Sequence, residues 1–480
     1  MGHHQTVERE NISVLYQIHL CHNSAYMVVS KIQRRMSLLQ RCLELEQRIL
    51  QLLRSSKADE NNNTRAILIS RELRENLVKV LERPREERDV REIERRLWKT
   101  CFYVFINMFR KDLASISEAN DSNMVEAKLD QFDTFLDEAK RFYEKLAKRN
   151  VSVNSEYRSL VYLGDIARYK QLHSRKYRGN KMTKTRFAEA EEYYKRALKL
   201  ETSFGSAHNQ LAVLATYRDA NIVATYHYVR ALYSRTPFRT ALSNLRTIFS
   251  RTMSKNKSTH VPKKTSKLQR CMQRFLDMNS SLFFAAESGS KKVVPDAKLL
   301  LATRNRLRRR FEELLEFQEK DDSSSSSSSS RDRVQTVVST SAFLDQLMTI
   351  SMFTHRQCRE AWKNSSFTNR PGLEIVFAHT HISMSDIATC AARKICDIES
   401  KKKNNNNNYT KRLRVARRHL LRTCRLYCQW LSADVMSRFS PKIFSRDGDV
   451  SNKNVASLVD ALYVCLCVCL SMCFKNSFRT

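Results

Sequence analysis

Apolar residues along this chain recur mainly at intervals of three and four, which is the spacing of one face of an α-helix. The clearest runs cover residues 16–54, 91–113 and 124–149, and polar segments such as "SSKADENNNT" separate them. The centre of the second run is strongly aromatic, with Trp98 and Phe102 among its members. The pattern predicts a series of long amphipathic helices that pack on one another.

Composition supports a helical chain. Only 7 Gly and 6 Pro occur among 480 residues, although tight hairpins and phosphate-binding loops depend on glycine for positive φ and close backbone approach. Leu, Arg, Lys, Glu and Ala are abundant, and these residues favour helix. The sequence therefore predicts an all-α fold and argues against a nucleotide-driven enzyme with a glycine-rich loop.

Residues 160–249 contain a repeat of the tetratricopeptide type, in which small and aromatic residues recur so that paired helices approach closely. In "NQLAVLATYRDANIVATYHYVRAL" the matching positions are Ala212, Ala224, Tyr228 and Ala231. The preceding pair matches at Gly164, Ala190, Tyr194 and Ala197, with a basic insertion between its two helices. These positions are predicted to be structural.

Changes in composition divide the chain. We expect a helical domain with tetratricopeptide-type repeats over 1–250, a basic linker over 251–265, and a domain of α-helical hairpins, superhelical in type, over 266–440. Flexible insertions are predicted at 321–332, which is serine-rich, and at 401–408, which is asparagine-rich. For residues 441–480 we expect a tail, cysteine-rich in its apolar part, that is either atypical or spurious.

The apolar stretch at 461–474 in that tail has 14 residues. A membrane-spanning helix needs about 20, so no membrane span is expected.

Charge and reactive residues narrow the function classes. The net charge of +35 favours anionic partners such as phosphoproteins, RNA or acidic membrane. The 13 cysteines show no zinc-type spacing, so neither a metal nor a disulfide framework is expected. No nucleophile elbow, no H-E-x-x-H and no cofactor motif is present. We expect no catalytic residues, no cofactor and a protein that is not an enzyme.

What remains is recognition of an anion by side chains. Arg110 ends the aromatic helix, "LVYLGDIARYK" contains Arg168 and Tyr169 just before its last residue, and Asn209 opens "NQLAVLA". Converging guanidinium groups bind phosphate with fixed bidentate donors, and an asparagine amide can hold a peptide backbone. A plainer interpretation stays open, in which Arg168 pairs with Asp165 one turn earlier and Tyr169 belongs to the core.

These segments resemble a known family. "LVYLGDIARYK", "AEEYYKRALKL", "HNQLAVLATY" and "ATYHYVRAL", together with "RRLWKTCFYVFINMF", are similar to the core of the Est-one/Smg family of nonsense-mediated mRNA decay factors, and within it to the Smg-five branch. The resemblance implies a 14-3-3-like fold combined with tetratricopeptide repeats over 1–250. It also implies that "RRLWKTCFYVFINMF" belongs to the third helix of that fold.

The resemblance carries a phosphopeptide site with it. In 14-3-3 proteins a Lys and an Arg one heptad apart on the third helix, and an Arg-Tyr pair on the fifth, hold the phosphate. Here Arg168 and Tyr169 match the pair, Arg110 matches the second basic residue, and Asn209 matches the residue that holds the ligand backbone.

One position departs from the motif. Tyr103 stands seven residues before Arg110, where the motif has Lys. That change removes one cation and is expected to weaken phosphate binding. Lys99, one turn earlier, is a further candidate for the missing charge.

The resemblance implies a non-catalytic adaptor that binds the phosphorylated up-frameshift RNA helicase and dimerises with a Smg-seven-like paralogue. Protein phosphatase 2A and RNA are left open as further partners. The expected location is the cytoplasm, with shuttling to the nucleus left open. Two alternatives remain: a basic RNA- or telomerase-associated protein of Est-one type, and a tetratricopeptide module that clamps acidic C-terminal peptides.

Overall fold

The computed structural model describes residues 38–54, 60–82, 86–119, 121–149, 152–178, 187–255, 267–288, 302, 305–307, 309, 329–364, 387, 391, 418 and 423. Over these residues the ordered structure is helical, apart from turns and an isolated parallel bridge between Phe204 and Thr236. The all-α prediction is confirmed. The chain forms two compact units, Met1–Thr202 and Ser203–Thr480.

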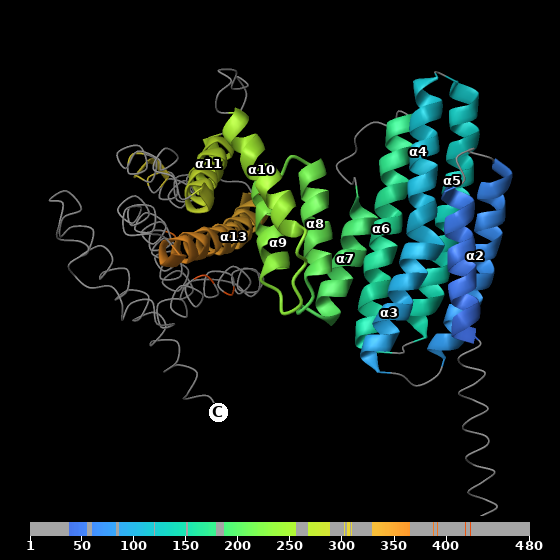
Figure 1. Ribbon diagram of the computed structural model, residues 1–480. Coiled ribbons are helices and arrows are strands. Elements are labelled where there is room, and N and C mark those ends of the chain that lie inside the picture. Colours follow the sequence, from blue (N-terminus) through green and yellow to red (C-terminus); the bar gives the residue numbers. More distant parts are fainter. Residues whose placement is uncertain are drawn as a thin grey trace, which may run out of the picture. The chain divides into compact units, whose positions relative to one another are not determined.

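The first unit is a bundle of long helices, in which Figure 1 shows α2 to α6 side by side. It contains a helix over 38–54, then α2 (Glu60–Leu81), α3 (Glu87–Trp98), η1 (Lys99–Tyr103), α4 (Val104–Glu118), α5 (Ser122–Lys148), α6 (Val153–Arg178) and α7 (Ala188–Leu200). α3, η1 and α4 follow one another without a break, and η1 is a turn of π-helix. A π turn inside an α-helix changes which residues share a face.

Local sequence explains where these helices begin. Asp121 caps α5, and its carboxylate accepts a hydrogen bond from the Met124 backbone N–H at 3.0 Å. The Ser152 hydroxyl does the same before α6, where it accepts from the Ser155 N–H at 3.1 Å. Both side chains satisfy a backbone donor that the first helical turn leaves unpaired.

The core of the first unit is aromatic. Phe109 of α4 stacks on Phe132 of α5 with ring centroids 5.1 Å apart, and Phe102 of η1 meets Tyr143 of α5 at 5.2 Å. Phe102, Phe132 and Tyr143 are fully buried. The aromatic helix expected from the sequence therefore supplies the centre of the bundle, where large rings contribute most of the buried apolar area.

The second unit is built from successive helix hairpins. Its described helices are α8 (Gly205–Tyr217), α9 (Asn221–Leu232), α10 (Ala241–Lys255), α11 (Lys267–Ser288) and α13 (Ser329–Asn364). α8 packs on α9, α9 on α10, α10 on α11, and α13 on both α9 and α11. The tetratricopeptide positions are buried as predicted, and the members in this unit are Ala212, Ala224, Tyr228 and Ala231.

The observed units and helix ends differ from the predicted domain bounds. The compact units meet between Thr202 and Ser203, because the core of the second unit joins α8–α10 to α11 and α13. α10 continues to Lys255, into the predicted linker, since Thr252 is buried against its neighbours. α13 begins at Ser329, so the end of the predicted serine-rich insertion is helical; serine is favoured at helix starts.

Several expectations fall elsewhere on the chain. Residues 321–328, the asparagine-rich segment 401–408 and the tail 441–480 lie outside the described residues, so the predictions for them stay predictions. Among the helices that the structure describes, none has the length and apolar character needed to cross a bilayer.

Candidate anion-binding site

The candidate site lies where the continuous helix α3–η1–α4 runs beside α6. The two run in the same direction, because Glu94 pairs with Arg158 near their starts and Arg110 meets Tyr169 further along. Between these points Trp98 stacks on Tyr162, with ring centroids 4.5 Å apart and planes 10° apart. Ionic and aromatic contacts therefore fix the register of the two helices.

Tyr169 is the centre of the site. The guanidinium carbon of Arg168 lies 4.3 Å from the centroid of its ring, and that of Arg110 lies 5.5 Å from the same centroid. Both are within cation–π range. Three of the residues proposed from the sequence thus lie together, and they come from two different helices.

The positive charge of Arg168 is balanced by the carboxylate of Asp165. It is buried, with 7 % of its surface exposed, and its Nη2 donates to Asp165 Oδ1 at 3.0 Å. Burial lowers the pKa of Arg168, but Asp165, Tyr194 and Tyr169 together raise it more, so the pKa lies well above its ordinary value. The plainer interpretation of the sequence therefore holds for both members of the pair, since Tyr169 is buried as well.

Tyr194 of α7 holds Asp165 from the other side. Its hydroxyl donates to Asp165 Oδ1 at 2.7 Å. The ring lies directly under α6 at Gly164, where a Cβ atom would come within 2.3 Å of the Tyr194 ring. Glycine is required at this position, and the tetratricopeptide packing of α6 on α7 thereby fixes the position of Arg168.

Arg110 differs from Arg168 in its surroundings. It is half-buried on α4, and its Nη1 donates to the Asn107 side-chain oxygen at 3.1 Å. Among the described residues no carboxylate forms an ion pair with it. Arg110 therefore supplies a positive charge that the site does not itself neutralise.

The π turn places Tyr103 on the same face. The N–H of Val104 bonds to the carbonyl of Lys99, and this turn brings the Trp98 and Tyr103 rings to 6.3 Å although they are five residues apart. Tyr103 is 38 % exposed and lies two turns before Arg110. Lys99 is exposed too, and it has no ion pair within the described part of the chain. The exposed aromatic ring thus stands where a third cation was expected.

Asn209 belongs to the other compact unit. It is buried on α8, and its side-chain oxygen has no hydrogen-bond partner among the described residues. Its participation in the same site as Arg110 stays a prediction.

Sequence reasoning missed two polar contacts of the site. These are the hydrogen bond from the Tyr194 hydroxyl to Asp165 and the hydrogen bond from Arg110 to Asn107. The position of Asn107 three residues before Arg110 was a usable signal, because residues three apart on a helix are neighbours.

Within the described residues we also looked at groups that could bind a metal and at cysteines that could act as nucleophiles. No group of three or more His, Cys, Asp or Glu side chains with the geometry of a metal site is found there. Cys42, Cys101 and Cys358 are buried free thiols. Burial raises the pKa of the Cys358 thiol to about 12, which leaves it unreactive as a nucleophile.

The helices and their packing define an all-α protein built from tetratricopeptide-type helix pairs. A family model described as "Est1 DNA/RNA binding domain" matches residues 190–458, and one described as "Telomerase activating protein Est1" matches residues 92–154. The first match covers more than half of the chain. The chain therefore belongs to the Est1 family, and the predicted Est-one/Smg membership is confirmed.

Relatives from both Smg branches are similar to this chain. Nonsense-mediated mRNA decay factor SMG7 of Arabidopsis thaliana is 36% identical over 123 residues, which are 26% of this chain and 11% of that protein. Nonsense-mediated mRNA decay factor SMG5 of Danio rerio is 36% identical over 129 residues, again 26% of this chain and 11% of that protein. The matched part is therefore about a tenth of either relative's length.

Among solved structures, the C. elegans SMG5–SMG7 complex has a chain with a TM-score of 0.40 and 13% identity to this one. The match covers 87% of this chain and 99% of that chain. The fold assignment rests on the described helices and the family models, not on this score.

Proposed function

We propose that this chain is a non-catalytic adaptor of nonsense-mediated mRNA decay that binds the phosphorylated up-frameshift RNA helicase. The names of the SMG7 and SMG5 relatives support the pathway. The observation that carries the binding site is Arg110, a half-buried guanidinium that lies on the ring of Tyr169 beside Arg168 and has no carboxylate partner among the described residues.

The division of labour between the two arginines follows from their charge balance. Asp165 cancels the charge of Arg168, so the main contribution of Arg168 is to hold Tyr169 in place beside Arg110. Arg110 contributes the net positive charge, and a guanidinium binds a phosphate strongly because its donors match two phosphate oxygens. With Tyr103 in place of Lys, we expect weaker binding than in a pocket with three cations.

Partners and location extend the proposal. We propose dimerisation with a Smg-seven-like paralogue and residence in the cytoplasm. Co-purification of the chain with such a paralogue, followed by light scattering, measures the stoichiometry. A chain that stays monomeric beside an excess of the paralogue contradicts the dimer.

Fluorescence anisotropy tests the phosphate site. A phosphoserine peptide of the helicase is expected to bind more tightly than its unphosphorylated form, and Arg110→Glu is expected to remove the difference. Arg110 is the better residue to change than Arg168, since reversing the buried Arg168 beside Asp165 would disrupt the packing of α6 on α7.

Lys111→Glu is the matched control, because Lys111 is the exposed neighbour of Arg110 on the same helix and the change in net charge is identical. We expect Lys111→Glu to keep the preference for the phosphorylated peptide. Equal binding of the two peptides by the unaltered chain contradicts the phosphate site and leaves the dimer proposal standing.

A second candidate function is binding of nucleic acid as an Est-one-type protein. The family model over residues 190–458 is named for DNA and RNA binding, and the net charge is +35. If the chain contacts many phosphates, the logarithm of its RNA affinity falls steeply and linearly with the logarithm of salt concentration. A flat salt dependence contradicts this candidate.

A further inference from the structure

A second basic region lies in the first unit, on residues that the candidate site does not use. It is a cavity of about 350 Å³ between α2 and α5. The charged residues that line it are Arg71, Arg74, Lys145, Arg149, Glu75 and Glu138. Four cations thus face two carboxylates, and the lining carries an excess of positive charge.

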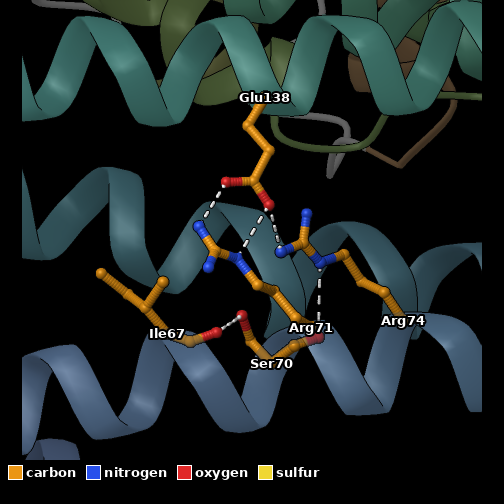
Figure 2. Close-up of polar contacts among 5 residues, drawn as sticks. All are labelled: Ile67, Ser70, Arg71, Arg74 and Glu138. Atoms are coloured by element: carbon orange, nitrogen blue, oxygen red, sulfur yellow. Dashed lines mark hydrogen bonds and ion pairs between the residues drawn. The ribbon is translucent and has the colours of Figure 1, made fainter.

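Two arginines share one carboxylate at one end of this cavity (Figure 2). Arg71 donates two hydrogen bonds to the Glu138 carboxylate, from Nε at 3.2 Å and from Nη2 at 2.9 Å. Arg74 donates to the same carboxylate from Nη2 at 2.7 Å. A single carboxylate cannot neutralise two guanidinium groups, so this cluster keeps a net charge of about +1 at neutral pH.

Burial and packing fix Arg74 in its position. Its guanidinium carbon lies 4.9 Å from the centroid of the Phe102 ring, and its Nε donates to the Ser70 carbonyl at 3.3 Å. Figure 2 shows Arg71 and Arg74 directed from α2 at Glu138 on α5. The donors are therefore preorganised, which lowers the entropic cost of gripping an anion.

The cavity extends along the two helices. α2 and α5 run in the same direction, because Arg71 meets Glu138 at one end and Glu82 meets Arg149 at the other. Eleven residues of helix separate the two ends, which is about 16 Å at 1.5 Å per residue. That length matches about five residues of an extended peptide at 3.3 Å each.

Lys145 lies between these ends and resembles Arg110 in lacking a partner. It is exposed on α5, and no carboxylate of the described residues forms an ion pair with it.

The apolar part of the lining is formed by Val78, Phe142 and Leu146. An apolar floor between cations suits a peptide with a hydrophobic side chain between acidic ones. It suits a sugar-phosphate backbone poorly, because such a backbone presents a charged phosphate at every nucleotide and no apolar side chain between the charges.

We propose that the α2–α5 cavity is a binding site for a short acidic peptide segment of a protein partner. The segment lies extended along the cavity, its carboxylates meet Lys145 and the Arg71–Arg74 pair, and an apolar side chain enters between Val78 and Phe142. This site is separate from Arg110 and does not depend on phosphate.

The test uses the full chain and fluorescence anisotropy with a fluorescein-labelled peptide that has a central leucine flanked by aspartates. The same peptide with asparagines in place of aspartates is the uncharged control. We expect saturable binding of the aspartate peptide, little binding of the asparagine peptide, and a loss of about tenfold in affinity for Lys145→Glu, which reverses a direct charge contact. Glu138→Gln is expected to strengthen binding several-fold, because it releases both arginines.

Lys148→Glu is the matched control, since Lys148 is exposed on the same helix but does not line the cavity. It is expected to leave the affinity unchanged. Equal losses for Lys145→Glu and Lys148→Glu overturn the proposal, because they indicate attraction to the basic chain as a whole. Displacement of the peptide by oligouridine, with the same sensitivity to Lys145→Glu, overturns it in favour of RNA.

Discussion

Two arginine–carboxylate clusters of the first unit differ in their charge balance and in their exposure to solvent. On α6, one arginine faces one carboxylate, and the side chains of Arg168 and Asp165 are each only 8% exposed. Between α2 and α5, two arginines face one carboxylate, and Glu138 is 27% exposed. The first cluster is balanced and closed, whereas the second keeps positive charge beside an open cavity.

This difference in charge balance distinguishes arginines that hold neighbouring side chains in place from cations that can bind an anionic ligand. A buried, balanced pair costs desolvation and contributes mainly by fixing geometry, so Arg168 orders Tyr169 and α7 more than it attracts a ligand. Cations without their own carboxylate retain their attraction for an anion. In the two regions these cations are Arg110 and Lys145, and each stands beside a cluster that is already organised.

The largest expected effect is on the balanced cluster. Asp165→Ala leaves the buried Arg168 without its partner, and breaking a buried pair in this way is expected to cost about 3–5 kcal/mol of the free energy of unfolding. Urea unfolding followed by circular dichroism measures the change. Asp137→Ala is the control, since Asp137 pairs with Lys170 at the surface and its loss is expected to cost about 1 kcal/mol or less. Similar losses for the two variants contradict the distinction.

The packing beneath that cluster gives the next effect. Gly164→Ala places a methyl group within 2.3 Å of the Tyr194 ring, and overpacking of this kind typically costs about 1–3 kcal/mol. The shift of Tyr194 is also expected to loosen its hydrogen bond to Asp165. Thermal unfolding of the variant tests the first expectation, and a melting temperature equal to that of the unaltered chain contradicts it.

The next effect is a gain in affinity for the phosphoserine peptide when Tyr103 is replaced by lysine. Tyr103→Lys adds a cation on the face of Arg110, where Tyr103 is exposed enough to be replaced. We expect about a tenfold rise in affinity for the phosphoserine peptide, which corresponds to one added charge-assisted contact. Isothermal titration of both peptides measures it. A rise of the same size for the unphosphorylated peptide shows that the added lysine does not contact the phosphate.

The smallest effect concerns the pH dependence of the shared cluster. Burial raises the pKa of Glu138, but the hydrogen bonds and positive charges of Arg71 and Arg74 together lower it more, so the folded pKa lies below its ordinary value of 4.5. Stability from this cluster is therefore present above pH 4.5 and is lost as the pH falls through the folded pKa.

Glu138→Gln is expected to cost about 1 kcal/mol or less at neutral pH, because the site is partly exposed. The difference in urea midpoint between the two chains is expected to shrink below pH 4.5. A difference that stays constant with pH contradicts the assigned shift.

Much of the fold follows from the sequence. The three-and-four spacing indicated the helices, and Gly164 and Tyr194 indicated the close approach of α6 and α7 that the structure contains. The π turn at Lys99–Tyr103 gave no signal, because its apolar spacing resembles that of an ordinary helix. The division at residue 202 also escaped the sequence, since the packing of α8–α10 on α11 and α13 depends on contacts between distant segments.

The proximity of three candidate residues could be predicted, but their charge balance could not. The family resemblance brought Arg110, Arg168 and Tyr169 into one hypothesis, and the structure places them near one another, while their binding of a phosphate stays a prediction. Spacing also offered Asp165 as a partner of Arg168, yet only burial showed that this pair is closed. The α2–α5 cavity gave no signal, because Arg71 and Glu138 are 67 residues apart.

The most direct test of the account exchanges the two charge reversals between the two ligands. Arg110→Glu and Lys145→Glu are each titrated with the phosphoserine peptide and with the aspartate–leucine peptide. We expect Arg110→Glu to remove only the preference for the phosphorylated peptide, and Lys145→Glu to weaken only the binding of the aspartate–leucine peptide. If either variant weakens both ligands equally, the two regions do not bind independently and the account is contradicted.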